Sequence, residues 1–327
     1  MSTTFTPNIQ WLEAINDNNF DENAIKLFRF QYENVLLYRE YCQLLGISPE
    51  HVQCIKDIPF LPINFFKTHQ IINKNVQSCL HFESSGTTGM TPSKHFIAHP
   101  EYYELSFRKA FAQFYGHPKD YIIVGLLPSY LERKHSSLVY MVRDLIKQSE
   151  HPMSGFYLYE TEKLATLLQS PLDRPVFLIG VTFALLDFAE MYPMNLQGHV
   201  IMETGGMKGR KEEWTRMEVH DLLKSQWNLK EVHSEYGMSE LLSQAYATAN
   251  GLFHPAPTMR VLLREENDPL LTMRTGSGCA NIIDLANIDS CAFIATEDIA
   301  KVYQDGSFEI LGRRDAAALR GCSLMVL

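Results

Sequence analysis

A first group of residues that can do chemistry lies between residues 84 and 94. It follows the strand-like segment LHFE and ends with Lys94. Its other members are hydroxyl residues and glycines, namely Ser84, Ser85, Gly86, Thr87, Thr88 and Gly89. Glycines let the backbone turn its N–H groups toward an anion, while hydroxyls and a lysine add donors and positive charge. The spacing differs from that of a Walker A loop. The group predicts a phosphate-binding loop, although similar clusters also form plain turns.

A second group, residues 236–240, follows the strand-like segment LKEVHSE. It places Tyr236, Gly237, Ser239 and Glu240 in one loop. An aromatic ring can stack on a purine, and the carboxylate of Glu240 can bind a magnesium ion. The alternative is a turn from a strand into a helix, in which Ser239 caps the helix.

Two charged groups lie nearer the C-terminal end. The letters TED, residues 296–298, follow the run CAFIA, and GRRD, residues 312–315, closes the segment SFEILG. Asp298 can accept hydrogen bonds from ribose hydroxyls, and Arg313 can bind a phosphate. Either residue can equally be a solvated loop charge.

The elements that must position these groups follow from the hydrophobic pattern. A helical period begins near Asp21 and ends near Gly46. Between residues 80 and 191, short apolar runs alternate with helical periods, which favours an α/β fold with a parallel sheet. The segments HVIMETGG and LKEVHSEYG predict two more strands. The segments TMRVLLRE, NIIDLAN, CAFIATED, IAKVYQ and SFEILG then predict a smaller β-rich lobe. Ligands bind at the carboxyl edges of parallel strands, so the glycine-bearing strand ends should form the site.

Composition limits the class of protein. The chain has 327 residues, of which 46% are hydrophobic and 20% charged, as in globular proteins with a large core. Its formal net charge of −9 argues against a nucleic-acid partner. No apolar run resembles a secretory signal or a membrane span, and we expect a soluble cytoplasmic protein. The six cysteines form no C-x-x-C pair, which favours reduced thiols.

Taken together, in this order and at these separations, the four groups resemble the motifs of the adenylate-forming superfamily of acyl-CoA ligases and synthetases. The match is closest to the acyl-protein synthetases of bacterial bioluminescence fatty-acid reductase systems. It rests on IPFLPINFFK, LLPSYLERKHSSLVYMV, GGMKGRKEE, YGMSE, CAFIATED and the terminal LRGCSL. The resemblance covers about residues 55 to 327. It implies the α/β large domain of these enzymes, with parallel and mixed sheets, helices and a β-rich C-terminal lobe.

The resemblance also implies roles for single residues. Thr87, Thr88 and their neighbours would bind the phosphates of ATP, and Lys94 would add positive charge. Tyr236 would pack on adenine, beside a turn at Gly205 and Gly206. The remaining roles would be contact of Ser239 with the α-phosphate, magnesium binding by Glu240, ribose binding by Asp298, and ribose or α-phosphate binding by Arg313.

Two departures from the family are visible. Glu297 stands where the family has glycine, and Ser239 where it has threonine. Other members continue into a further domain that carries a catalytic lysine. No lysine follows Lys301 here, so we expect that lid and its lysine to be absent, as in the acyl-protein synthetases. The resemblance makes Cys322 the candidate acceptor of the acyl group, with core packing of this cysteine as the alternative.

The sequence thus predicts an ATP- and magnesium-dependent ligase for a carboxylic acid, with a long-chain fatty acid as the first candidate. An acyl-accepting reductase or carrier protein would be its partner. We expect an N-terminal helical segment over residues 1–54 and an ATP- and acyl-binding region over 55–250. A β-rich lobe over 251–315 and a tail over 316–327 should follow. The alternatives are an acyl-CoA or aryl-CoA ligase without a lid, and a non-catalytic nucleotide-binding module.

Overall fold

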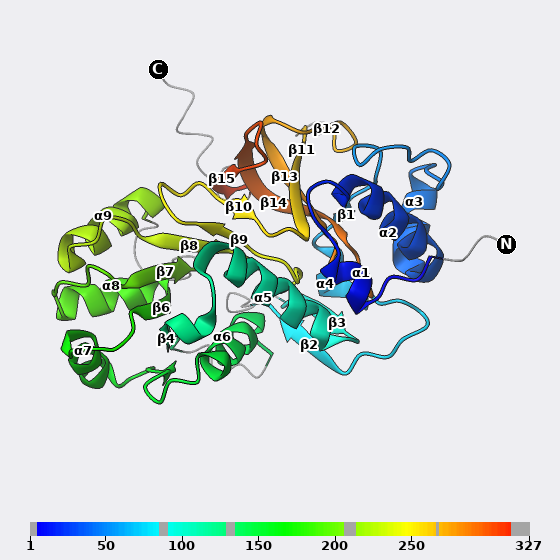
Figure 1. Cartoon of the computed structure of the whole chain (residues 1–327). Helices are drawn as coiled ribbons and strands as arrows, with labels where there is room; N and C mark the ends of the chain where they lie inside the picture. Colours follow the sequence, from blue (N-terminus) through cyan, green and yellow to red (C-terminus); the bar gives the residue numbers. More distant parts are fainter. Residues whose placement is uncertain (1–4, 85–90, 129–134, 206–213, 266–267, 315–327) are drawn as a thin grey trace, which may run out of the picture.

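Two β-sheets, a small hairpin and surrounding helices make up the computed structural model of the chain (Figure 1). It describes residues 5–84, 91–128, 135–205, 214–265 and 268–314. The fold is of the α/β class with parallel and mixed sheets and a β-rich C-terminal part, as predicted. Within these ranges no helix combines the length and the apolar character needed to cross a membrane.

The larger sheet has seven strands in the order β10-β9-β8-β7-β6-β4-β5. Neighbours from β8 to β5 run parallel, and β9 and β10 are antiparallel. Its central strands β4 and β6 are buried throughout, which explains their continuous apolar runs. The bounds are β4 Ile122–Leu126, β5 Gly155–Phe156, β6 Val176–Val181, β7 Val200–Thr204, β8 His233–Tyr236, β9 Ala245–Ala247 and β10 His254–Pro255.

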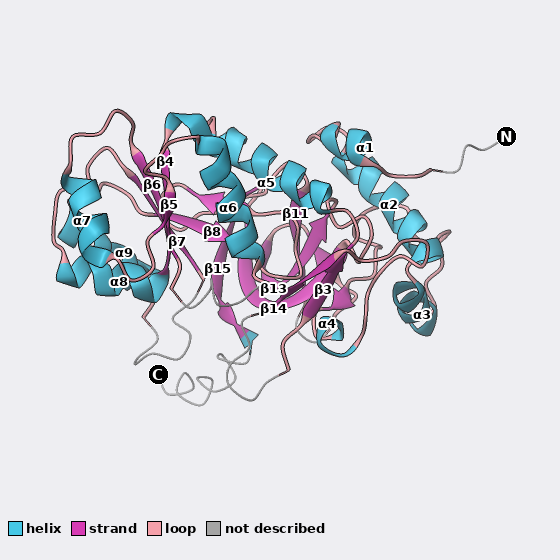
Figure 2. Cartoon of the chain, turned by 90° about the horizontal axis from the view of Figure 1, so that it is seen from below, coloured by secondary structure: helices cyan, strands magenta, loops and turns pink. Residues whose placement is uncertain are grey.

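Helices cover both faces of this sheet, and the views in Figures 1 and 2 place α5 and α6 on the face opposite α8 and α9. Successive parallel strands must be joined by a connection that crosses the sheet, and this connection is usually a helix. Their bounds are α5 Pro100–Tyr115, α6 Ser137–Ser149, α7 Thr161–Gln169, α8 Thr182–Met191 and α9 Arg216–Trp227, with a 3₁₀ turn at Pro118–Asp120.

The second sheet has six strands in the order β1-β14-β13-β11-β12, with β15 paired to β14. Except for β1, which runs parallel to β14, its pairs are antiparallel. The segments CAFIATED and IAKVYQ, predicted as two strands, form the single strand β14. The bounds are β1 Leu61–Pro62, β11 Met259–Arg264, β12 Thr272–Met273, β13 Gly276–Asp284, β14 Phe293–Val302 and β15 Phe308–Arg313. A separate hairpin pairs β2 Leu80–Glu83 with β3 Lys94–Ile97.

The helical period near the N-terminus forms two helices rather than one. After α1 (Ile9–Glu13), helix α2 runs over Phe20–Asn34 and α3 over Leu36–Leu44, because Val35 between them has extended backbone angles. Gly46 follows α3 with a φ of +69°, a conformation that favours glycine and ends the helix as predicted. The short helix α4 spans Phe65–Thr68.

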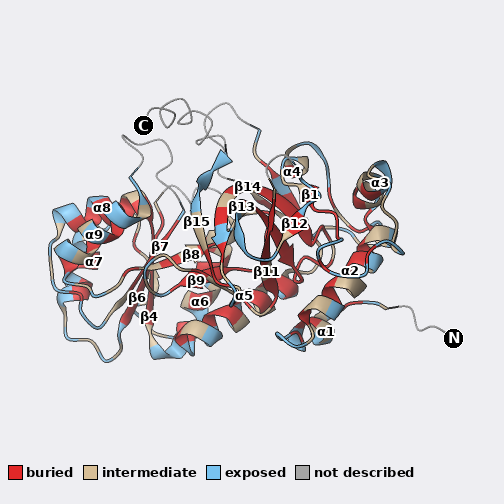
Figure 3. Cartoon of the chain, turned by 90° about the horizontal axis from the view of Figure 1, so that it is seen from above, coloured by how far each residue is buried: buried red, intermediate tan, exposed pale blue. Residues whose placement is uncertain are grey.

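One continuous apolar core joins these parts, as the buried residues in Figure 3 indicate. The N-terminal helices take part in it: Phe28 of α2 and Tyr38 of α3 both contact the ring of Phe293 on β14. Gln31 of α2 is also buried and donates to the carbonyl oxygens of Asn287 (2.6 Å) and Ile288 (3.0 Å).

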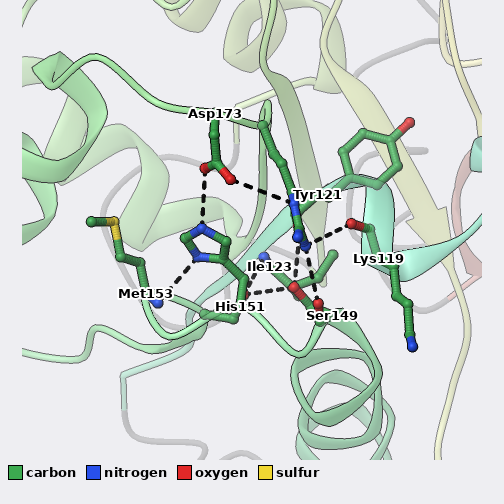
Figure 4. A network of polar contacts seen from close by, with 9 residues as sticks. Lys119, Tyr121, Ile123, Ser149, His151, Met153 and Asp173 are labelled. Carbon is green, nitrogen blue, oxygen red and sulfur yellow. Dashed lines mark hydrogen bonds and ion pairs between the residues drawn. The ribbon is translucent and has the colours of Figure 1, made fainter.

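At the amino-terminal edge of the larger sheet, a network of hydrogen bonds joins the end of α6 to the residues around the starts of β4 and β5 (Figure 4). The hydroxyl of Ser149, at the end of α6, donates to the carbonyl oxygen of Tyr121 at 2.6 Å and lies 2.8 Å from the Ser154 hydroxyl. Ser154 accepts from the amide of Ile123 at 2.9 Å. Arg174 donates to the Ser149 carbonyl oxygen at 3.3 Å. These bonds satisfy buried polar groups at the edge opposite the candidate site.

Candidate active site

The carboxyl ends of β7 and β8 bring two predicted groups together. The strands are parallel and in register, with Thr204 opposite Glu235, so Gly205 and Tyr236 each lie one residue beyond this pair. Gly205 has a φ of +78°, and its carbonyl oxygen accepts from the Thr182 hydroxyl at 3.1 Å. The neighbouring Gly206 lies outside the described residues. Gly205 and Tyr236 therefore lie at the edge of the sheet where parallel strands commonly bind ligands.

The β2–β3 hairpin holds both ends of the predicted phosphate loop. The Ser84 amide donates to the Ser93 carbonyl oxygen at 3.1 Å, and the Ser93 amide donates to the Ser84 hydroxyl at 2.9 Å. Lys94 pairs with Glu83 across the strands, at 3.5 Å between Nζ and Oε1. The rest of the predicted loop, Ser85, Gly86, Thr87, Thr88 and Gly89, lies outside the described residues.

His81 and Lys94 lower the pKa of the Glu83 carboxyl group. Partial burial would raise the pKa of its carboxyl group, but the hydrogen bond from His81 at 3.0 Å and the charge of Lys94 lower it below the usual value. The ring of His81 also stacks on that of His135, at 4.0 Å between centroids. The Lys94 ammonium group therefore lies beside an ionised carboxylate at the end of the loop.

The loop that carries Glu240 is hydrogen-bonded to the β2–β3 hairpin. The Ser93 hydroxyl donates a short hydrogen bond to Glu240 Oε1. The Ser239 hydroxyl donates to the Glu83 carbonyl oxygen at 3.0 Å, and His95 Nδ1 donates to the Ser239 carbonyl oxygen at 2.9 Å. Burial lowers the pKa of His95 to about 4, so this imidazole is neutral. Ser239 lies in a turn and caps no helix, because the chain continues into β9.

Asp298 of the predicted group TED is hydrogen-bonded both to Arg313 of the group GRRD and to Tyr236. Asp298 on β14 is buried, and its Oδ2 accepts from the Tyr236 hydroxyl at 2.7 Å. Its Oδ1 accepts from Arg313 Nε at 3.1 Å, because β14 and β15 pair with Asp298 opposite Arg313. Burial and the Asp298 charge raise the pKa of Tyr236 well above its usual value. Three residues far apart in sequence thus form one hydrogen-bonded group.

The Tyr236 ring is enclosed by aromatic side chains. Phe253 and Phe308 lie 5.9 Å and 5.5 Å from it between ring centroids, both roughly edge-to-face. The guanidinium carbon of Arg216, at the start of α9, lies over the ring of Phe253, 4.9 Å from its centroid. Arg216 also pairs with Glu203 of β7, at 3.3 Å between Nε and Oε1. The Tyr236 position is therefore fixed through packing as well as through Asp298.

Asp284 anchors the Glu240 loop and was missed by the sequence reasoning. This fully buried carboxylate accepts from the amides of Leu242 (2.6 Å) and Ser243 (3.0 Å) and from the Ser243 hydroxyl (2.5 Å). Burial raises its pKa even though these donors oppose the shift. Asn287, three residues later, donates to the Glu240 carbonyl oxygen at 2.9 Å. The signal available in the sequence was the lone carboxylate in the apolar segment NIIDLAN.

Arg264 supports the segment around Asp298 and was also missed. It is buried and donates to the carbonyl oxygens of Ala280 (3.0 Å) and Thr296. The Thr296 hydroxyl in turn accepts from the Asp298 amide at 3.2 Å. Burial lowers the pKa of Arg264, and the negative charge of Glu297 acts in the opposite direction. The glutamate that replaces the expected glycine therefore helps to balance a buried cation.

Magnesium fits the residues present through one carboxylate. Glu240 is buried beside the phosphate-loop hairpin, and carboxylate oxygens are ligands that magnesium prefers. Among the described residues, no group of three or more histidine, cysteine, aspartate and glutamate side chains is placed to hold a metal ion. Magnesium is usually bound by one or two carboxylates together with substrate phosphates, and Glu240 would be such a carboxylate. Cys322, the predicted acceptor, lies outside the described residues.

Comparison with known proteins gives a family match for part of the chain. Residues 6–98 match the family model described as acyl-protein synthetase, LuxE. No curated protein sequence matches.

Solved structures share the fold. An open conformation of 2-hydroxyisobutyryl-CoA ligase, in complex with 2-HIB-AMP and CoA, superposes with a TM-score of 0.65 at 12% identity, covering 94% of this chain and 80% of that chain. The thioesterification state of that enzyme gives 0.67 at 14% identity, with coverages of 95% and 72%. ATP-bound MatB from Rhodopseudomonas palustris gives 0.52 at 17% identity, with coverages of 71% and 47%.

The chain spans about half the length of the MatB structures that it matches. At these identities the likeness concerns the fold alone, which the chain shares with 2-hydroxyisobutyryl-CoA ligase and MatB. The resemblance inferred from the four sequence groups is confirmed at this level.

Proposed function

We propose that this chain is an ATP-dependent ligase that activates a carboxylic acid as an acyl-adenylate and then transfers the acyl group to a thiol. The observation that carries the proposal is the group formed by Tyr236, Asp298 and Arg313 beside the Glu240 loop. It places an aromatic ring at the end of β8, a buried carboxylate within β14 and a cation at the end of β15 in one group, near the hairpin that holds the ends of the predicted phosphate loop. The family match of residues 6–98 and the shared fold support the same reaction.

In the first step, a carboxylate oxygen of the acid attacks the α-phosphorus of ATP, and the bond to pyrophosphate breaks. Both reactants are anionic, so the site must reduce their repulsion. Lys94 and the donors of residues 84–89 would face the phosphates, and Arg313 the α-phosphate or ribose. Asp298 would accept from ribose hydroxyls, with Arg313 shifting away from one of its oxygens. Magnesium held by Glu240 would neutralise phosphate charge.

In the second step, a thiolate attacks the acyl carbon and AMP leaves. We assign the thiol to Cys322 and the acid to the long-chain fatty acids. The description of the matched family as acyl-protein synthetase supports an acceptor group on a protein. The choice of Cys322 and of a long-chain fatty acid follows the sequence resemblance. An acyl-accepting reductase or carrier protein would then remove the acyl group. Transfer to CoA is the second candidate, because the 2-hydroxyisobutyryl-CoA ligase of similar fold is described in complex with CoA.

Intact mass spectrometry tests this function. The protein is incubated with ATP, magnesium and a panel of fatty and aromatic acids. We expect a hydroxylamine-labile adduct of acyl mass with the preferred acid. Cys322→Ser should abolish it, whereas Cys54→Ser and Cys79→Ser, which alter exposed cysteines, should retain it. AMP formed only when CoA is added would instead identify a CoA ligase, and no AMP under any condition would favour a binding module.

A further inference from the structure

Glu235 is a carboxyl group within the candidate site that the proposed reaction does not use. It is the residue before Tyr236 on β8, and it lies opposite Thr204 of the parallel strand β7. The Thr204 hydroxyl donates a short hydrogen bond to Glu235 Oε2. Because Thr204 is followed directly by Gly205, this bond joins the two turns that the sequence analysis assigned to the adenine side.

The second oxygen of Glu235 packs against the turn that follows it. A Cβ atom built on Gly237 would lie 2.3 Å from Glu235 Oε1, far closer than any real contact, and 3.6 Å from Cγ of Gln244. The φ of Gly237 lies outside the left-handed region, so backbone strain does not explain the glycine. The carboxyl group of Glu235 occupies the space that a side chain at residue 237 would take. Glu235 therefore contacts both turns, one through each oxygen.

The surroundings of Glu235 disfavour a negative charge. Titratable groups near it are Glu203 on β7, Tyr103 and Tyr115 on α5, and Tyr246 on β9. Glu203 is itself ionised, since His220, Arg216 and Ser234 lower its pKa against the effect of burial. Burial raises the pKa of Glu235 to about 7, the Thr204 hydrogen bond opposes this shift, and the charge of Glu203 adds to it.

We propose that Glu235, in its neutral form, is a positioning residue that holds the Tyr236–Gly237 turn at a fixed place relative to Gly205 and so sets the affinity for the nucleotide. The proposal rests on the proposed function, because it assumes that these turns bind the adenine side of ATP. Ionisation would place a second anion next to Glu203 in a buried setting. The Tyr236–Gly237 turn would then have to move so that water could reach the Glu235 carboxylate, and the ordered binding site would be lost.

The test is the dissociation constant of magnesium-ATP, measured by calorimetry from pH 6 to pH 8. Binding by the neutral form alone, with a pKa near 7, weakens the apparent affinity about tenfold across this range. Glu235→Gln keeps the shape and cannot ionise, so its profile should be flat after division by the titration of ATP itself. That titration is measured on ATP in the same buffers without protein. Glu162→Gln, which alters an exposed glutamate on α7, is the matched control and should follow the wild type.

Two further variants separate positioning from general damage to the fold. Thr204→Val removes the hydroxyl and should weaken binding at every pH, whereas Thr204→Ser should restore it. A wild-type profile parallel to that of Glu235→Gln, with ATP still bound, would overturn the role of Glu235 and leave the proposed function intact. Absence of ATP binding by the wild type at every pH would overturn both.

Discussion

At the scale of single residues, Asp298 is the group on which nucleotide binding should depend most. Both of its carboxylate oxygens are used, by Tyr236 and by Arg313, and the side chain is buried. An amide in its place would present an NH₂ group to one of these two donors. Hydrogen bonds to charged groups contribute about 1.5–3 kcal/mol each.

We therefore expect Asp298→Asn to weaken ATP binding by roughly 10- to 100-fold, since about 1.4 kcal/mol corresponds to a factor of ten. Calorimetric titration with magnesium-ATP measures this. The matched control is Asp305→Asn, which alters an exposed aspartate in the turn between β14 and β15 and should bind ATP normally. Equal affinities for the two variants would remove Asp298 from the nucleotide site.

The candidate site residues could be predicted from the sequence, whereas the residues that support them could not. Tyr236 and Arg313 stand next to glycines, Glu240 follows in the same loop as Tyr236, and Asp298 belongs to the charged group TED. The structure brings these residues to one region. Asp284 and Arg264 end the strands β13 and β11, and Glu203 lies within β7. Their partners come from other elements, so no local pattern shows what a buried charge in such a strand contacts.

At the scale of elements, the apolar runs and their glycine ends predicted the strands well, while two boundaries were wrong. Val35 separates α2 from α3 without a glycine or proline, because its extended conformation is set by tertiary packing rather than by local preference. Strand β14 continues through Glu297 and Asp298, which resemble loop residues in the sequence. Asp298 pairs with Arg313 of β15, whereas the pairing of β14 with β13 shifts register between Ala295 and Ile299, so the two residues lie at an irregularity of the strand.

The network in Figure 4 should contribute to stability and leave binding unchanged, since it lies at the edge of the sheet opposite the site. Ser149→Ala leaves the Tyr121 carbonyl oxygen without its donor, and we expect a loss of about 1–3 kcal/mol in the free energy of unfolding. Urea denaturation measures it. Ser170→Ala removes an exposed hydroxyl that also bonds to a helix carbonyl, and it should change stability by less than about 0.5 kcal/mol. Similar losses for both variants would contradict a structural role for this network.

At the scale of the whole molecule, the two sheets and the N-terminal helices share one core. Gln31 shows why this could not be read from the sequence: it accepts from the Ala292 amide at 2.9 Å and donates to the loop near Asn287, more than 250 residues away. The family resemblance predicted the fold class, because it compares whole arrangements of motifs. The packing of α2 and α3 on β14 depends on contacts between distant segments, which only the structure provides.

We propose above all that Tyr236, Asp298, Arg313 and the Glu240 loop form a site that makes an acyl-adenylate. Exchange of labelled pyrophosphate into ATP tests it most directly, because exchange requires reversible adenylation and does not require Cys322, CoA or a partner protein. We predict exchange that depends on magnesium and on added acid, that survives Cys322→Ser, and that falls with Asp298→Asn. ATP binding without exchange for any acid in the panel would contradict the account.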